Sequence, residues 1–445
     1  MFLQHLQDNV ADSKDQRDGL KILHRLDDHT RELRVKLDDV LDRRLVRTFF
    51  NLAVIILMFR ERRMGLLLSE LGGHLCGQSK APAGTKRISN LLRSKKWTSK
   101  LIDDYFFAQT VQGIHELVQS GKRALLLWDD SRIEKHESWL SEGLCSVWSS
   151  KAKRLTRMRP GYYRPPKERI CVPGIKWSAV FLSALGQAPR VAQMTWWTTR
   201  GKHKEDPDNI IWRLLHKIDQ QIIDPVLHVF DRGDASEKMV RYLLHFNQDF
   251  LIRWRKNVYL LYDQKRLRID QISRKTKPRV CRTIYDKERK KTRRISIGWT
   301  SVAHPDHAHK QLTMIVVRNI KHSGGPMYLL CSLSIQNAAI AWEMVATYAH
   351  RWEAEQGFRF LKSEMGIESP RLWFWENRLK LMAIVTLVND ILLHTLRTNR
   401  DWVEKLFRRW CHRTGKRYRK ASVPLYRLRL AISACLSSLW HQSSG

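Results

Sequence analysis

Apolar residues in the N-terminal part of the chain recur three and four positions apart, from about residue 28 to residue 119. This spacing is typical of amphipathic helices, so we predict a helical region there. The longest apolar run, residues 49–59, is interrupted by Asn51 and flanked by arginines, which favours a buried core helix. Residues 1–20 are polar, and we expect them to be loosely structured.

The pattern changes at residue 124, where short apolar and aromatic runs typical of strands begin. These runs cover residues 124–130, 176–183, 190–197, 226–231 and 249–254. Helical patterns at 209–221 and after Asp234 separate the later runs. Three neighbouring strands, followed by strands that alternate with helices, predict a mixed α/β sheet.

Strand patterns return between residues 255 and 332, and helical patterns follow from residue 336 to about 364 and again over 371–400. The first of these segments therefore looks like a β-rich insertion into the α/β core. We divide the chain into a helical N-terminal domain (1–119), the first part of the core (120–254), the insertion (255–332), the second part of the core (333–370), and a helical basic C-terminal region (371–445).

The net charge of the chain limits the kinds of partner that it can have. It has 80 Lys and Arg against 44 Asp and Glu, a formal net charge of +36, and such a basic protein needs a polyanionic partner or an anionic membrane surface. No segment reaches the roughly 20 apolar residues of a membrane-spanning helix, so we expect no membrane. The seven scattered cysteines form no CxxC pair, which favours a reducing compartment. We therefore expect a cytoplasmic protein that binds nucleic acid.

A helix-turn-helix is one interpretation of residues 65–97. A short apolar helix ends at Gly72-Gly73, a loop follows, and Thr85 can cap a second, basic helix that includes Arg87 and Arg93. Such a second helix can enter the major groove of DNA. An ordinary helical hairpin with a solvated basic face is the alternative.

Three carboxylates are candidates for chemistry. Asp129 and Asp231 end apolar strands, where α/β sheets present their sites, and Glu355 lies on a later helix. Together they could bind two divalent cations, which activate the attacking oxygen and stabilise the leaving one in phosphoryl transfer. Aspartate at a strand end is also a common turn former. Asp130 is an alternative to Asp129 as the metal ligand. Neighbouring side chains on a strand point to opposite faces, so only one of the two can take this role.

The segment around Glu355 strengthens the metal interpretation. Tyr348, Arg351, Glu355 and Lys362 share one stripe of a continuous helix, because their spacings are close to whole turns. Such a polar stripe is unsuited to packing in a hydrophobic core, but it would hold a metal-binding carboxylate among groups that contact phosphates. A solvated face with ion pairs such as Arg351–Glu355 is the alternative.

The arrangement Tyr-x2-Arg-x3-Glu-x6-Lys resembles the signature of bacterial insertion-sequence transposases of the DDE type, insertion-sequence family four. Asp129-Asp130-Ser131 and Asp231-Arg232 resemble the family's two upstream acidic motifs, and the insertion lies where the family has one. The resemblance implies a bacterial, nucleoid-associated enzyme of α/β fold, with an RNase H-like mixed-sheet catalytic core, a β-rich insertion, and helical N- and C-terminal regions.

The resemblance also implies a mechanism. Asp129, Asp231 and Glu355 would bind two Mg²⁺ or Mn²⁺ ions per active site. Tyr348, Arg351, Lys362 and Arg232 would contact DNA near the cut. The enzyme would recognise terminal inverted repeats, cut the transposon ends through a hairpin intermediate, and join them to target DNA as a homodimer in a synaptic complex. Residues 1–119 would be its DNA-binding domain, and residues 371–445 are the candidate dimerisation region.

In the family, an aromatic residue of the insertion stacks on a flipped base. Tyr328 occupies the matching strand here, and Trp299 on a neighbouring strand is a rival. Either ring could instead pack the core of the insertion. Basic residues interleaved with aromatic ones suit DNA contact at residues 151–169, 274–294 and 408–420, although each stretch could also be a solubilising surface. Two other functions remain open: a DNA-binding regulator descended from a transposase, and a nuclease that cuts without joining.

Overall fold

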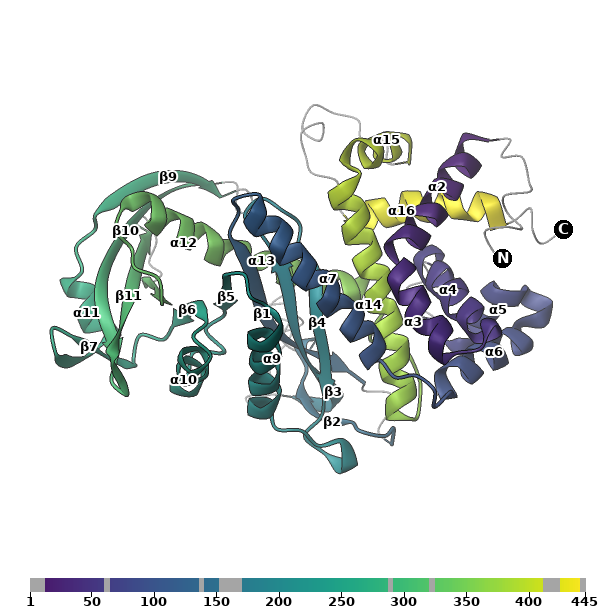
Figure 1. Ribbon diagram of the computed structural model, residues 1–445, viewed down its shortest axis with the longest axis horizontal. Coiled ribbons are helices and arrows are strands. Elements are labelled where there is room, and N and C mark those ends of the chain that lie inside the picture. Colours follow the sequence, from purple (N-terminus) through teal and green to yellow (C-terminus); the bar gives the residue numbers. More distant parts are fainter. Residues whose placement is uncertain are drawn as a thin grey trace, which may run out of the picture.

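The computed structural model describes residues 13–59, 65–135, 140–151, 170–286, 291–319, 325–410 and 425–440. Figure 1 shows three parts side by side: strands of the insertion at one end, the central sheet, and a group of helices that contains the helices nearest both ends of the chain. The order of strands and helices confirms the predicted mixed α/β class.

The helical part combines segments from both ends of the sequence. Its elements are α2 (Lys14–His29), α3 (Arg31–Val40), α4 (Arg43–Met58), α5 (Leu68–Cys76), η1 (Gln78–Lys80), α6 (Ala81–Arg93), α7 (Lys100–Gln119), α14 (Trp375–Thr398), α15 (Arg400–Trp410) and α16 (Leu425–Trp440). The helix α16 packs against α2 and α4, so the regions 1–119 and 371–445 share one hydrophobic core.

The expectation that residues 1–20 are loose was wrong for the described residues from Ser13 onward. The helix α2 begins at Lys14 because the Ser13 side chain accepts a hydrogen bond from the backbone of Gln16, whose side chain in turn accepts one from the Ser13 backbone. Leu23 and Leu26 are then buried in the shared core. The local sequence is polar, but its few apolar residues are spaced to pack against distant helices.

Two helices are buried along most of their length. The helix α4 contains nearly all of the apolar run 49–59, which confirms the predicted core helix. By length and composition alone α14 could cross a membrane, but 83% of its most apolar window is buried inside the protein. The burial is that of a core helix.

The helices α5 and α6 form the predicted pair with different bounds. The helix α5 continues through Gly72 and ends before Gly77, which has a φ of +85°. Thr85 lies inside α6, where its hydroxyl donates to the backbone oxygens of Ala81 and Leu68. The helices cross so closely that a Cβ on Gly84 would lie 2.1 Å from the carbonyl oxygen of Gly72. Gly72 and Gly84 therefore allow the close crossing of α5 and α6, and neither forms a turn.

The described strands form one twelve-stranded sheet in the order β2-β3-β1-β5-β6-β12-β11-β10-β7-β8, with β4 paired to β3 and β9 to β10. Their bounds are β1 Ala124–Glu134, β2 Cys145–Trp148, β3 Cys171–Ser183, β4 Arg190–Trp197, β5 Val226–Phe230, β6 Asp249–Trp254, β7 Tyr259–Tyr262, β8 Lys265–Arg268, β9 Val280–Asp286, β10 Lys291–His304, β11 His307–Asn319 and β12 Met327–Cys331. The pairs β1–β5 and β5–β6 are parallel, and the other strand pairs are antiparallel.

The strands of residues 255–332 extend the central sheet, because β12 pairs with β6 on one side and β11 on the other. The remaining helices are α9 (Pro207–Gln221), α10 (Glu237–His245), α11 (Ile269–Lys275), α12 (Ala338–His350) and α13 (Trp352–Ser363), with the short η2 at Gly201–His203.

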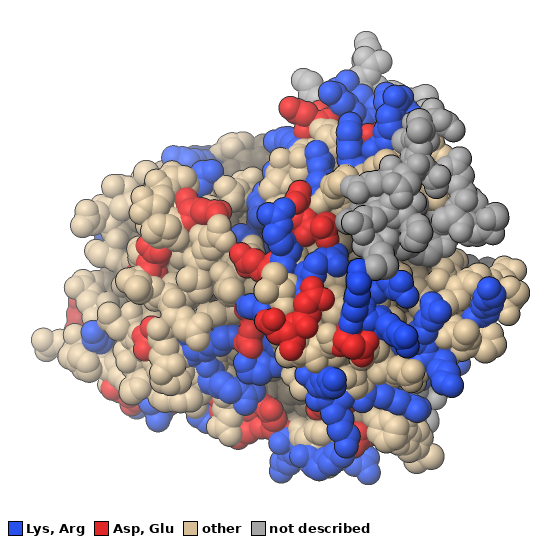
Figure 2. Space-filling model, turned by 45° about the vertical axis from the view of Figure 1, so that its right-hand side comes forward, with Lys and Arg blue, Asp and Glu red and all other residues tan. Residues whose placement is uncertain are grey.

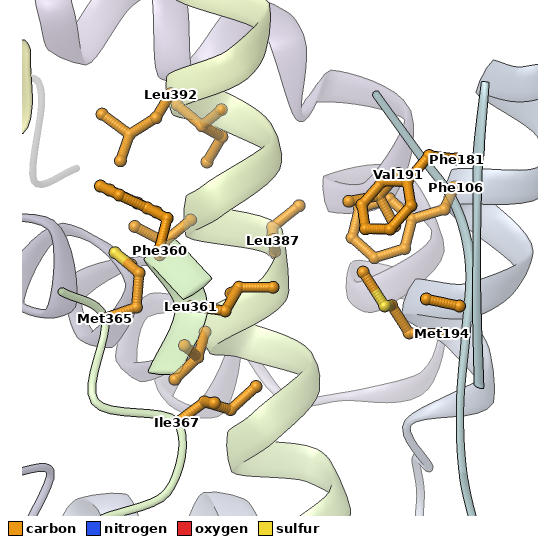
Figure 3. Packing of buried hydrophobic residues seen from close by; sticks show 14 of the residues in the cluster. Phe106, Phe181, Val191, Met194, Phe360, Leu361, Met365, Ile367, Leu387 and Leu392 are labelled. Atoms are coloured by element: carbon orange, nitrogen blue, oxygen red, sulfur yellow. The ribbon is translucent and has the colours of Figure 1, made fainter. Parts of the chain in front are cut away.

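Two hydrophobic clusters cover opposite faces of the sheet. On β1, Leu125 and Leu127 belong to one cluster, whereas Leu126 and Trp128 belong to the other. In the first cluster, Figure 3 shows α14 between two groups of side chains: Phe360, Leu361, Met365 and Ile367 of α13 and the loop after it, and Phe106, Phe181, Val191 and Met194 of α7, β3 and β4. This packing fixes α13, and with it Glu355, over one face of the sheet.

Candidate active site

Asp129 and Asp231 occupy equivalent positions along the neighbouring parallel strands β1 and β5. Asp231 directly follows β5, as predicted, whereas the prediction that Asp129 ends its strand was wrong, because β1 continues to Glu134 through its pairing with β3. The β1–β5 register runs from Ala124↔Val226 to Leu127↔Val229, and two more residues along each strand lead to the two aspartates. Because side chains alternate along a strand, Asp129 points to the same face as Leu125 and Leu127. This is the face that α13 covers, so the register brings the two carboxylates under that helix.

The helix that carries Glu355 is interrupted, so the expected continuous stripe is wrong. The helix α12 ends at His350 and α13 begins at Trp352, with Arg351 between them. The His350 ring lies 2.8 Å from the Ser183 hydroxyl, which ties the end of α12 to the end of β3. The interruption separates Tyr348 from Glu355 in the helix but leaves both side chains near the aspartates.

Phe358 sets the position of α13 on the sheet. Its ring meets Trp177 of β3 edge-on, with centroids 4.5 Å apart, and Phe181 at 5.7 Å. Glu355 lies three residues earlier, less than one helical turn away. The aromatic contacts of the helix thus hold its carboxylate over this face of the sheet.

Arg351 lies among the three carboxylates. Its Nη2 donates to Glu355 Oε1 at 2.5 Å, Nη1 lies 3.5 Å from Asp129 Oδ1, and Nη2 lies 3.9 Å from Asp231 Oδ1. Only 7% of the Arg351 side chain is exposed. The Tyr348 hydroxyl donates to Asp231 Oδ1 at 2.8 Å. The structure therefore brings together Asp129, Asp231, Tyr348, Arg351 and Glu355.

Burial and neighbouring charge shift the acid strengths of this group. Burial raises the pKa of Asp129 to about 7, although Arg351 opposes the shift. Burial also acts to raise the pKa of Asp231, but the pKa is lowered, because hydrogen bonds from the Arg232 backbone and Tyr348 together with the charges of Arg351 and Arg253 outweigh burial. Burial raises the pKa of Tyr348 to about 12, so its hydroxyl stays protonated as a donor. The pKa of Arg351 is raised because the carboxylates outweigh its burial.

Asp130 and Asp129 are separated by the pleat of β1. Asp130 accepts a hydrogen bond from Ser178 and lies near Lys176, on the face opposite Glu355, and burial raises its pKa. The sequence analysis missed a fourth acid, Asp234. Burial and then the charges of Asp130, Asp129 and Asp231 raise its pKa to about 8. Its place three residues after Asp231, before a helix, was the available signal.

The other predicted DNA contacts are more dispersed. Lys362 is half-buried and lies seven residues beyond Glu355, about 10 Å along the helix axis. Arg232 is exposed beside Asp231, and Arg87 and Arg93 are exposed on α6.

Neither aromatic candidate offers a free ring face. Tyr328 and Trp299 are each only 7% exposed, and each belongs to a hydrophobic cluster. The guanidinium of Arg279 also covers the Trp299 ring, at 4.7 Å from its centroid. Trp352, which the sequence analysis did not consider, is 38% exposed and directly follows Arg351.

Basic residues gather on the surface of the molecule. Figure 2 shows Lys and Arg side chains around a smaller group of Asp and Glu on the face in view. Of the predicted basic stretches, residues 152–169, 287–290 and 411–420 lie outside the described residues. On β9 and β10, Arg282 and Arg294 are exposed.

The donor atoms of the site suit hard divalent cations, since all three carboxylates offer oxygen. Within the part of the chain that the structure describes, however, no group of three or more His, Cys, Asp or Glu is arranged to hold a metal ion. The three carboxylates are too far apart for this because they are spaced around the guanidinium of Arg351. The residue types fit Mg²⁺ or Mn²⁺, whereas their present spacing fits an arginine.

Comparison with known proteins identifies the class of the site. Residues 197–389 match the family described as transposase DDE domain, a segment that includes Asp231 and Glu355 and starts after Asp129. This match makes the chain an enzyme that cuts and transfers DNA. Enzymes with a DDE transposase domain depend on divalent metal ions.

The other comparisons add less. No curated protein matches the chain significantly. Among solved structures, the chain is similar to the cryo-EM structure of the piggyBac transposase synaptic complex with hairpin DNA. The identity is 11% and the TM-score 0.44, over 91% of this chain and 73% of that chain.

Proposed function

We propose that this chain is a cut-and-paste DNA transposase in which Asp129, Asp231 and Glu355 bind two Mg²⁺ or Mn²⁺ ions. The observation that supports this most is the convergence of the three carboxylates, from β1, β5 and α13, on one cation, the Arg351 guanidinium. Residues so far apart in the sequence meet over one face of the sheet, around one guanidinium group.

When bound, the metal ions would activate the attacking oxygen and stabilise the leaving oxygen of a phosphodiester. The protein's own groups would prepare the site. The Tyr348 hydroxyl and the Arg232 backbone stabilise the Asp231 carboxylate in its ionised form. Arg351, Arg232 and Lys362 would supply positive charge to the phosphates near the cut.

The finer assignment rests on topology and motif. The strands β4-β3-β1-β5-β6 form three antiparallel strands followed by two parallel ones, with the acids on β1 and after β5. We propose that this half of the sheet is the RNase H-like core and that the chain belongs to insertion-sequence family four. We also propose a homodimeric synaptic complex, a hairpin intermediate, and recognition of transposon ends by α6 through Arg87 and Arg93.

The test is cleavage and joining of end DNA with Mg²⁺, using DNA that carries the terminal inverted repeats flanking the gene. Asp231→Asn and Glu355→Gln should each reduce cleavage by at least about a hundredfold, because each removes a charge needed to bind metal. Asp306→Asn is the matched control, since this exposed aspartate lies in the β10–β11 turn and should leave cleavage unchanged.

The products separate the alternatives. Joined DNA supports a transposase, cut but unjoined DNA indicates a nuclease, and bound but uncut DNA indicates a regulator. If Asp231→Asn cuts as fast as the parent protein, the assignment of the site is wrong.

A further inference from the structure

We propose that Arg351 is a resident counter-ion of the active site, which divalent metal must displace, and that the displaced guanidinium then binds a DNA phosphate. This inference rests on the proposed function, because it takes the three carboxylates as the metal ligands. It goes further by making metal binding and DNA binding mutually dependent through one side chain.

The first support is the position of the guanidinium. It donates to Glu355 and faces Asp129 and Asp231 at 3.5 and 3.9 Å, so it compensates all three carboxylates at once. A divalent ion bound to the same oxygens at about 2.0–2.1 Å would overlap this space. It would also meet a buried like charge. The two cations therefore cannot occupy the site together.

The second support is that Arg351 is incompletely satisfied where it lies. Its Nε and Nη1 are buried and make no hydrogen bond within the described residues, although Nη1 forms an ion pair with Asp129 Oδ1 at 3.5 Å. Buried N–H groups without an acceptor are costly, and a buried charged group more so. A phosphate, with several oxygens in reach of a planar guanidinium, offers what the present site lacks.

The third support is the backbone. Arg351 lies at the interruption between α12 and α13, where its N–H bonds to the Tyr348 carbonyl three residues before it. The flanking groups are held independently, His350 by Ser183 and Phe358 by Trp177. The Arg351 side chain can therefore change its partner while the helices that position Tyr348 and Glu355 remain in place.

These facts imply reciprocal coupling. A phosphate that attracts Arg351 frees the carboxylates for metal, and metal that replaces Arg351 frees the guanidinium for phosphate. By thermodynamic linkage, DNA should tighten metal binding by the same factor by which metal tightens DNA binding. Without DNA, the site should hold metal weakly, which would restrict the chemistry to bound ends.

The first experiment measures Mn²⁺ binding to the full chain without DNA, by the electron paramagnetic resonance signal of free Mn²⁺. Arg351→Met should bind Mn²⁺ at least about tenfold more tightly than the parent, because a competing charge within 4 Å is removed. Arg351→Lys, which keeps the charge, should gain less. Arg241→Met is the control, since it breaks an exposed i,i+4 pair with Glu237 on α10 and should leave Mn²⁺ binding unchanged.

Arg351→Met leaves three carboxylates close together, so its folding is followed by thermal unfolding. Mn²⁺ should raise its Tm by more than it raises that of the parent. If this variant does not fold, Arg351→Gln, which keeps hydrogen-bonding groups but no charge, replaces it. The proposal is overturned if the neutral variant binds Mn²⁺ no more tightly, or if its tighter binding survives Asp231→Asn in the same chain.

The second experiment adds a short DNA duplex. DNA should tighten Mn²⁺ binding to the parent, and Arg351→Met should lose most of this effect. Equal tightening in both proteins would refute the coupling. These results are independent of cleavage: if Arg351→Met binds Mn²⁺ more tightly but the parent never cuts DNA, the proposed function fails alone. If Asp231 is needed for cutting but Arg351→Met changes nothing, the counter-ion proposal fails alone.

Discussion

Tyr348 offers the sharpest test of how the site is supported. Sequence resemblance makes it a phosphate contact, whereas the structure shows its hydroxyl donating to Asp231 Oδ1 at 2.8 Å. The two roles predict different defects for Tyr348→Phe, which removes only the hydroxyl. Loss of support for Asp231 weakens metal binding, while loss of a phosphate contact weakens DNA binding.

The magnitude follows from the bond and its exposure. A hydrogen bond to a charged acceptor contributes about 1.5–3 kcal/mol. The Asp231 side chain is 36% exposed, so water replaces part of the lost bond, and we expect about 1–2 kcal/mol. This corresponds to about a five- to thirtyfold higher Mg²⁺ concentration at half-maximal cleavage, with unchanged affinity for DNA.

The assay is single-turnover cleavage of end DNA over a range of Mg²⁺ concentrations, with DNA affinity measured separately in EDTA. Tyr105→Phe is the control, because this buried tyrosine donates to the His29 carbonyl at 2.5 Å, between α7 and α2. That variant should lose stability but keep the Mg²⁺ midpoint. A weaker DNA affinity with an unshifted Mg²⁺ midpoint in Tyr348→Phe would refute the support of Asp231.

Three further results are expected. Gly84→Ala should lower the free energy of unfolding by at least about 2 kcal/mol, because its Cβ would clash with Gly72. Gly73→Ala, whose Cβ would meet only ordinary contacts, should be neutral or stabilise the protein by up to about 1 kcal/mol. Equal unfolding free energies of the two variants in urea melts would contradict the close crossing of α5 and α6. His228 accepts a bond from Trp128 and burial lowers its pKa to about 4, so the unfolded chain alone binds a proton between pH 6.5 and 4. The free energy of unfolding should therefore fall by about 3 kcal/mol as pH falls through that range, and His228→Gln should remove this part; an identical pH dependence in the variant would refute it. Removing divalent ions with EDTA should abolish cleavage and weaken DNA binding in a gel-shift assay without abolishing it, and cleavage that persists would exclude the metal mechanism.

The sequence by itself determined the local elements. The strands at 190–197 and 249–254 have the bounds that their apolar runs predict, and the helix at 209–221 begins only two residues earlier than predicted. Glu355, Asp129 and Asp231 could also be singled out from residue types and spacing, although Asp129 lies within β1 and not at its end. Such features depend on neighbours within a few positions, so a linear pattern carries them.

Only the tertiary structure decided how these elements combine. The β1–β5 register placed Asp129 beside Asp231 and turned Asp130 to the other face. The contact of His350 with Ser183 accompanies the interruption at Arg351, which no helical periodicity in the sequence revealed.

Long-range packing also buried the ring of Tyr328 and joined the helices of both chain ends into one core. These outcomes depend on residues far apart in the sequence, and their energies come from pairing and burial that a local pattern does not encode. The carboxylates came from the sequence, and the arginine that compensates them became evident from the fold.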